Sequence, residues 1–303
     1  MSMRYAAGFI SAFYNPLKNP DAPTIGTATG GSGSASITFT APSNVGGSAI
    51  TSYIVISTPS GITGTAASSP VTVSGLSNGT AYTFKVFANN SYGPSPLSAA
   101  SNSVTPALAI GSAFGGGYFA GQISTAGNGV ADYNLVVGPV SSTQNLSIQW
   151  KTSNTTTAGT SSVIDGPANS TAMNDASHPA AQFCEAITTG GFSDWYMPAK
   201  NELDVCYFNL KPTTTANNTS YGINANAVPA RASNNTSGNP AQTSATDFRD
   251  TGAEDFVANF YWSSTELSAK YGYMQHFNYG NQNSTTQYKN ASLRVRAIRR
   301  VAV

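Results

Sequence analysis

Charged residues are scarce in this 303-residue chain: only 9% are Asp, Glu, Lys or Arg, and the net charge is +1. A nearly neutral chain has no general attraction for nucleic acid or for anionic membranes. Aromatic residues make up 11% of the chain, and low charge with ample aromatics is the opposite of a disordered composition. We therefore expect a folded surface of the extracellular type, whose partners are recognised by local chemistry.

Long hydrophobic runs are also missing. The tract from Ala107 to Ile123 is interrupted by Gly115, Gly116 and Gly117 and by Gln122, and it falls short of the ~20 apolar residues that a membrane span needs. The first residues, Met1 to Tyr14, carry Arg4 and a short apolar stretch but no Ala-x-Ala-like cleavage site, and they run into Asn15-Pro16. This pattern favours an N-terminal arm over a signal peptide, and we expect no membrane insertion.

Histidine and cysteine, the usual residues of catalytic and zinc sites, occur twice each, as His178, His276, Cys184 and Cys206. Both cysteines fall at helical spacing on apolar faces, which favours two reduced core thiols; a disulfide joining the two helices is the alternative. A zinc site would require the thiols to leave those faces, and a Ser-His-Asp site has few options. We predict no cofactor, no metal and no enzymatic activity, with a structural role for His178 at a helix start.

Acidic residues gather only in one stretch, at Asp247, Asp250, Glu254 and Asp255. Their oxygens could bind calcium, but the spacing does not match an EF-hand loop, so solvated carboxylates or helix caps are favoured.

The last strand, Leu293 to Arg300, holds the chain's basic group. Arg294 and Arg296 share a face there, and we expect them to pair with acids such as Glu202 or Glu266.

The chain is long enough for two domains. From Pro20 to Ala107, short alternating runs are separated by Gly, Pro, Ser and Asn, which is typical of an all-β sandwich. The motif VSGLSNGTAYTFKVFANNSYG, with Leu76, Gly79 and Tyr82 in place, resembles the E–F corner of the fibronectin type III family. The resemblance implies a fibronectin type III domain over residues 20–107. Its expected role is that of a spacer, and direct binding by the module is the alternative.

Helical signals appear only in the second part of the chain. One helix is predicted from Ser177-Pro179 to before Gly190, and another between Pro198 and Pro212. The segment from Lys211 to Asp255 lacks periodicity, which indicates a functional loop or an insertion that packs on itself.

The pieces GGFSDWYMP and YWSSTE, the two helices and the final Arg-x-Arg strand resemble the C-type lectin-like C-terminal domain of the Legionella collagen-like adhesin family. The sharpest matches are Trp195, Pro198, Glu202, Leu203, Tyr261 to Glu266, Phe277, Gly280, Arg294 and Arg296. The resemblance implies an α+β C-type lectin-like domain over residues 108–303, preceded by the sandwich and by an N-terminal arm at 1–19, in a mostly β chain.

Two departures from related proteins bear on this domain. Ala199 stands where related sequences often have the Ser or Thr of a capping box, so we expect a weaker helix start. The Glu-Pro-Asn and Trp-Asn-Asp motifs of calcium-binding animal lectins are absent, so calcium-dependent sugar capture is not implied. Formylglycine-generating enzymes share the fold but use an active cysteine pair, which the core positions predicted for these thiols do not offer.

Alternation along the strand YGYMQHFNYG predicts which residues are displayed. If Tyr273, Gln275 and Phe277 turn inward, the neighbouring side chains turn outward and lead into a turn. Tyrosine with Asn and Gln is typical of adaptable binding surfaces. We predict a ligand-facing surface formed by Met274, His276, Asn278, Tyr279, Asn281 and Asn283, and an ordinary exposed strand is the alternative.

The order arm, spacer and lectin-like head resembles that of phage structural proteins. We expect a non-enzymatic phage virion protein, attached to fibre, tail or capsid, whose head binds a host surface glycan or protein and whose arm binds other virion proteins. A homotrimer on the virion surface is implied by the resemblance, although no coiled-coil or collagen repeat supports it. The alternatives are a capsid decoration protein without a specific ligand and a secreted adhesin at the bacterial cell surface.

Overall fold

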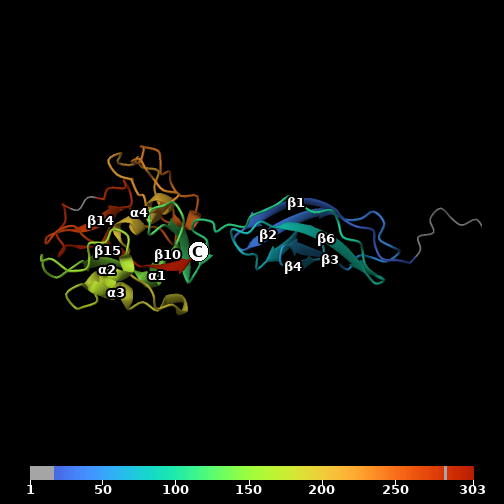
Figure 1. Cartoon of the computed structure of the whole chain (residues 1–303), viewed down its shortest axis with the longest axis horizontal. Helices are drawn as coiled ribbons and strands as arrows, with labels where there is room; N and C mark the ends of the chain where they lie inside the picture. Colours follow the sequence, from blue (N-terminus) through green and yellow to red (C-terminus); the bar gives the residue numbers. More distant parts are fainter. Residues whose placement is uncertain (1–16, 283–284) are drawn as a thin grey trace, which may run out of the picture. The chain divides into compact units, whose positions relative to one another are not determined.

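The computed structural model describes residues 17–282 and 285–303, and the chain divides into two compact units between Ala109 and Ile110 (Figure 1). Of the predicted N-terminal arm at 1–19, residues 1–16 lie outside the described part. The predicted mostly β class is confirmed, with a β-sandwich first and a β-rich unit with few helices after it. No helix in the described ranges is long and apolar enough to cross a membrane.

The first unit is a sandwich of two antiparallel sheets. One sheet has the order β1 (Thr24–Gly31), β2 (Ser34–Thr40), β5 (Val71–Ser74), and the other β4 (Thr63–Ala66), β3 (Ser52–Thr58), β6 (Thr83–Asn90), β7 (Gly93–Pro94). Alternate residues of β6, beginning with Phe84 and Val86, are buried in the core of the sandwich, as the alternation along the strand predicts. The hydroxyl of buried Tyr82 accepts a hydrogen bond from the Ser77 amide (3.1 Å), which fixes the E–F corner.

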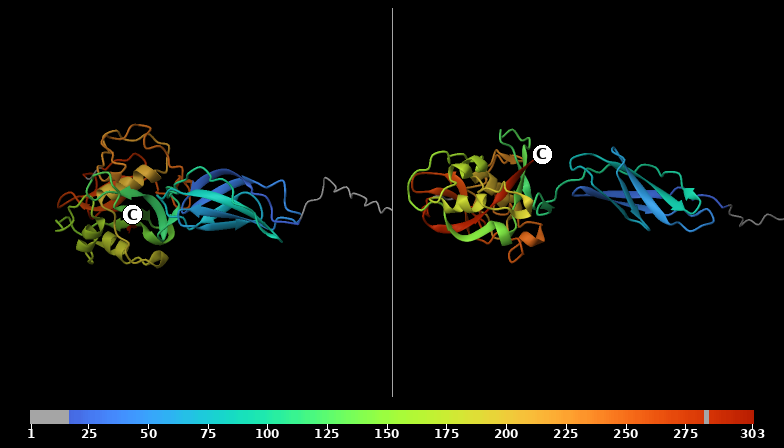
Figure 2. Two further views of the ribbon diagram at one scale, coloured as in Figure 1. Left: turned by 45° about the vertical axis from the view of Figure 1, so that its right-hand side comes forward. Right: turned by 90° about the horizontal axis from the view of Figure 1, so that it is seen from below.

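The second unit contains two sheets. The larger has the order β12 (Ala227–Val228), β9 (Gly117–Ile123), β10 (Tyr133–Val137), β16 (Ile298–Ala302), with β8 (Ala113–Phe114) beside β9. The smaller has the order β11 (Gln144–Gln149), β15 (Ser292–Arg296), β13 (Phe260–Glu266), β14 (Gly272–His276). The pair β13 and β15 is parallel and the others are antiparallel. Figure 2 shows the red carboxyl-terminal strand β16 beside the green strand β10.

Four α-helices belong to this unit: α1 (Val140–Thr143), α2 (Gly166–Ala172), α3 (Pro179–Glu185) and α4 (Lys200–Leu210). Two short 3-10 helices lie at Thr189–Gly191 and Thr246–Phe248. The helices α3 and α4 are the two predicted from the sequence, and α4 ends at Leu210, just before Pro212.

The second unit has two hydrophobic clusters, and each takes one cysteine. Cys206 lies with Leu203 and Tyr207 of α4 in the first cluster, and Cys184 lies with Trp195 and Trp262 in the second. Both thiols are free, so the alternative of a disulfide between the helices is wrong. Burial raises the pKa of Cys206 to about 12 and raises that of Cys184 as well, so both remain neutral thiols.

The start of α4 is capped in spite of Ala199. The Glu202 carboxylate accepts a hydrogen bond from the Ala199 amide (2.8 Å), and the Thr265 hydroxyl on β13 accepts one from the Lys200 amide (2.9 Å). The Val163 carbonyl accepts from the Asn201 amide (2.8 Å), so the first two amides of α4 are satisfied by acceptors from outside the helix.

The long segment after α4 packs on itself, and Figure 1 shows it as orange loops. The Asn217 side chain donates to the carbonyls of Thr236 (3.0 Å) and Pro240 (2.9 Å), and its own oxygen accepts from the Tyr207 hydroxyl. Hydrogen bonds of this kind replace regular secondary structure and hold a fixed surface beside α4.

Candidate functional site

The predicted display strand β14 is covered on both faces. On one side the Lys200 ammonium group of α4 lies 5.7 Å from the centre of the Tyr273 ring. On the other side Met274 is only 1% exposed and packs in the cluster of Trp262. The prediction that Met274 turns to solvent is therefore wrong, because simple alternation applies only to a strand with one wet face. Gln275 is buried as predicted.

Three of the residues predicted for the display surface, His276, Asn278 and Tyr279, come together where β14 ends. The His276 ring packs edge-on against the Phe260 ring (centroids 4.4 Å apart) and lies 4.9 Å from the Tyr279 ring, which is 43% exposed. We call Phe260, His276 and Tyr279 the aromatic cluster. Asn278 lies two residues after His276 and is half-buried.

The His276 ring is uncharged at neutral pH. Its Nδ1 accepts a hydrogen bond from the Asn278 amide (3.0 Å), and burial lowers its pKa below the usual value. The aromatic cluster is therefore a neutral surface that combines ring faces with the neighbouring amide of Asn278.

The remaining predicted site residues are placed differently. The Asn278 side-chain oxygen accepts from the Thr213 hydroxyl (2.7 Å), so its amide is held in one orientation. Asn281 is half-buried, and its side-chain oxygen has no hydrogen-bond partner in the described part of the chain. Asn283 lies outside the described residues. Phe260 was missed because its contact with His276 depends on the register of β13 and β14.

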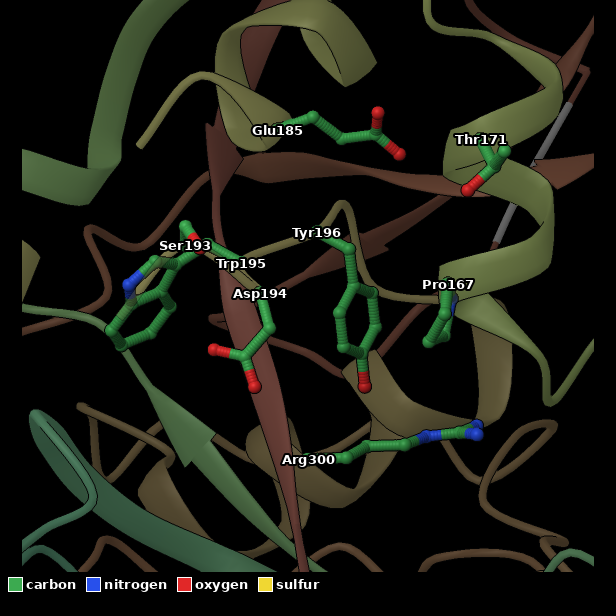
Figure 3. Close-up of a pocket in the computed structure, with 8 residues that line it drawn as sticks. All are labelled: Pro167, Thr171, Glu185, Ser193, Asp194, Trp195, Tyr196 and Arg300. Atoms are coloured by element: carbon green, nitrogen blue, oxygen red, sulfur yellow. The ribbon is translucent and has the colours of Figure 1, made fainter. Parts of the chain in front are cut away.

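A pocket of about 350 Å³ lies elsewhere in the second unit, between α2, α3 and β16. Figure 3 shows Thr171 and Glu185 on the two helices, with the Tyr196 ring between them and Arg300 below. Sequence reasoning did not single out this pocket, because its lining comes from three separated stretches of chain.

The charges around this pocket are mostly paired within the protein. Arg299 holds Asp194 through two hydrogen bonds (2.7 and 2.8 Å), which lowers the pKa of that carboxyl. The Arg300 guanidinium is bound to buried Glu202 (2.8 Å). Burial raises the pKa of Glu185 above its usual value, and no ion pair in the described residues involves it.

The acidic stretch serves the fold. The Glu254 carboxylate accepts from the Val140 amide (2.8 Å) and pairs with Arg296 (2.7 Å), while Asp255 accepts from the Thr251 amide (3.2 Å). Among the residues that the structure describes, no group of three or more His, Cys, Asp and Glu side chains could hold a metal ion.

The acids predicted to pair with Arg294 and Arg296, namely Glu202 and Glu266, have other partners. Arg296 pairs with Glu254, while Glu202 pairs with Arg300 and Glu266 with Lys289. Strand spacing gives the face of a side chain but not which loop covers it.

His178 precedes α3 and is 3% exposed. Its Nδ1 lies 2.9 Å from the Asp175 carboxylate and its Nε2 lies 2.8 Å from the Thr157 hydroxyl. Both ring nitrogens are occupied inside the fold, in keeping with the structural role predicted for this residue.

The chain thus combines a β-sandwich module with a β-rich unit that carries a neutral aromatic surface. A family model for the Lcl C-terminal domain matches residues 142–299, and one for the fibronectin type III domain matches residues 21–104. The chain belongs to the Lcl C-terminal domain family. The two matches indicate a surface protein of the adhesin type.

Solved structures similar to this chain include titin segments. The titin kinase with its flanking domains is 32% identical over 29% of this chain and 17% of its own, with a TM-score of 0.27. Titin domains A168–A170 are 33% identical over 29% and 32% (TM-score 0.27), and module A71 from human cardiac muscle titin is 32% identical over 29% and 91% (TM-score 0.24). The chain thus spans less than a third of the first two. No curated protein matches it.

Proposed function

We propose that this protein is a non-enzymatic virion protein of a phage, in which the sandwich is a spacer and the second unit is a C-type lectin-like head that adheres to the host cell surface. The family match to an adhesin domain supports adhesion. In this proposal the N-terminal arm binds other virion proteins, three copies assemble, and the head binds a host glycan or protein.

The observation that carries the proposal is the aromatic cluster. Tyr279 is large, 43% exposed and backed by the neutral His276 ring, so it offers rigid apolar area at little cost in conformational entropy. The fixed amide of Asn278 lies next to it and adds a hydrogen-bonding group. Aromatic and amide groups in this combination bind ligands without requiring charge.

The absence of catalysis belongs to the proposal and rests on the state of the reactive side chains. Both thiols are buried with raised pKa values, and a thiol in that state is a poor nucleophile. His178 is bound on both ring nitrogens, which leaves it no position for proton transfer to a ligand.

The test is equilibrium binding of the labelled full chain to intact bacteria. Replacing Tyr279 with Ser should weaken binding by about tenfold or more, because an anchoring ring is removed from the contact. Tyr288→Ser is the matched control, since Tyr288 is also exposed and stacks on Tyr271 outside the aromatic cluster. The control should bind like the unchanged protein.

Equal binding by all three proteins would contradict the proposal and favour a decoration protein without a specific ligand. The virion location is tested separately by looking for the chain in purified phage particles and in the culture medium. A chain found only in the medium or on the bacterial surface would favour a secreted bacterial adhesin.

A further inference from the structure

A second cavity, of about 210 Å³, lies where the long segment after α4 folds back onto that helix. Its lining is different from that of the aromatic cluster and from that of the pocket in Figure 3. The side chains that matter are those of Phe208, Arg231, Ser233, Asn234, Asn235 and Asn239. The cavity therefore combines one aromatic ring with hydroxyl, amide and guanidinium groups.

The positive charge of this cavity is neutralised inside the protein. The Arg231 guanidinium lies over the Phe208 ring (4.2 Å to its centre) and pairs with Asp204, which is almost fully buried. Asp204 also accepts a hydrogen bond from the side-chain amide of Asn224 (2.8 Å). Burial lowers the pKa of Arg231 to about 10, so the ion pair persists at neutral pH. An anionic ligand would have to compete with a buried carboxylate, which disfavours sulfated or carboxylated partners.

Two buried donors at this cavity lack partners. Asn235 is 7% exposed, and its side-chain nitrogen has no hydrogen-bond partner in the described residues. The Nε of Arg231 is also buried and has no hydrogen-bond partner in the described residues. Unpaired buried donors are costly, and a ligand oxygen that reached them would remove that cost.

We propose that this cavity binds one ring of a neutral saccharide. Sugar hydroxyls both donate and accept, which suits the donors of Asn235 and Arg231 together with the exposed side chains of Ser233, Asn234 and Asn239. The Arg231 guanidinium covers one face of the Phe208 ring, so Phe208 contributes apolar lining for the C–H groups of a pyranose, and the volume suits one ring and not a chain of them. The inference rests on the proposed function, because it names the ligand class for a second contact of the same head.

The test uses the full chain with methyl glycosides of glucose, galactose, mannose and N-acetylglucosamine as probes, followed by saturation-transfer NMR and titration. We expect at least one glycoside to bind with a dissociation constant on the order of 1 mM. Asn234→Leu replaces an exposed amide of the cavity lining with an apolar side chain and should weaken that binding at least tenfold, whereas Asn174→Leu, at an exposed position outside the cavity, should leave it unchanged.

Tyr279→Ser separates this inference from the proposed function, because it alters the aromatic cluster and not the cavity. It should leave glycoside binding unchanged. The inference is overturned if no neutral glycoside saturates or if Asn234→Leu binds like the unchanged protein. In each of these cases binding to cells that depends on Tyr279 would still stand.

Discussion

At the scale of single residues, Glu202 joins α4 to β16 and to the preceding loop. Its buried carboxylate accepts from the Tyr196 hydroxyl (2.5 Å), the Ala199 amide (2.8 Å) and the Arg300 guanidinium (2.8 Å). Burial raises the pKa of Glu202, and Arg300 opposes that effect. The carboxylate is retained in the interior because three donors, one of them the cationic Arg300, satisfy it.

We predict that Glu202→Gln lowers the free energy of unfolding by about 3 kcal/mol, because it removes the buried anion of Arg300 and leaves that guanidinium only the more distant Asp165 carboxylate (3.8 Å). Urea denaturation followed by circular dichroism measures the change. Glu185→Gln is the matched control; this carboxylate is half-buried and in no ion pair of the described residues, so the loss should stay under about 1 kcal/mol. Equal losses in the two variants would show that the pair with Arg300 does not stabilise the fold.

Asp175 predicts a dependence of stability on pH. Hydrogen bonds from Ser177 and His178 lower its pKa from 3.8 to about 2. A carboxyl group with a lowered pKa in the folded state stabilises the protein above pH 3.8, and that contribution disappears as the pH falls toward 2. The urea midpoint of Asp175→Asn should therefore lie below that of the unchanged protein at neutral pH and approach it near pH 2. A gap of constant size over this range would contradict the assignment.

The sequence predicted single residues well where one local rule decides their position. Tyr82 is placed by alternation and by a corner motif, and His178 by its position at a helix start. Met274 could not be placed in this way, because its burial depends on Trp262 and on the second covered face of β14. The cavity beside Phe208 gave no signal, because an unpaired donor such as Asn235 is defined only by what surrounds it.

At the scale of elements, the start of α4 shows how a missing cap is replaced. Thr265 on β13 accepts from the Lys200 amide (2.9 Å) and donates to the Ser162 carbonyl (2.8 Å). A helix that lacks a hydroxyl at its own N-cap thus depends on a side chain from a distant strand.

We predict that Thr265→Val destabilises the protein by about 2 kcal/mol, because it keeps the shape of the side chain but leaves the Lys200 amide unpaired and removes one of the two hydrogen bonds to the Ser162 carbonyl. Thr214→Val, at an exposed position, should change the unfolding free energy by less than about 0.5 kcal/mol. Chemical denaturation of both variants measures this. If Thr265→Val proves neutral, water satisfies the start of α4 and the strand does not cap it.

The sequence predicted the elements α3 and α4 from apolar spacing, proline and glycine. It did not predict α2, which has seven residues and begins at the Asp165 cap without an apolar repeat. The order of the strands in the sheets could not be predicted from the sequence either, since the parallel pairing of β13 with β15 joins strands about thirty residues apart in sequence.

At the scale of the whole molecule, each compact unit has its own core. The sandwich core is formed by residues of the first unit alone, and the two clusters of the second unit are formed by residues after Ile110. Separate cores should unfold as separate cooperative transitions.

We predict that Ile37→Val, which removes one methylene from the fully buried sandwich core, destabilises that unit by about 1 kcal/mol. Scanning calorimetry of the full chain should show a lower midpoint for one transition only. A single transition, or an equal shift of two, would mean that the units unfold together.

The claim that the second unit is an adhesive head is tested most directly by one measurement. The labelled full chain is titrated onto intact bacteria before and after their surface polysaccharide is stripped. The account predicts saturable binding to a host strain that weakens in Tyr279→Ser. Loss of that binding on stripping identifies a glycan as the ligand, and its persistence identifies a surface protein. Absence of saturable binding to every candidate host, by a chain that is folded by circular dichroism, would contradict it.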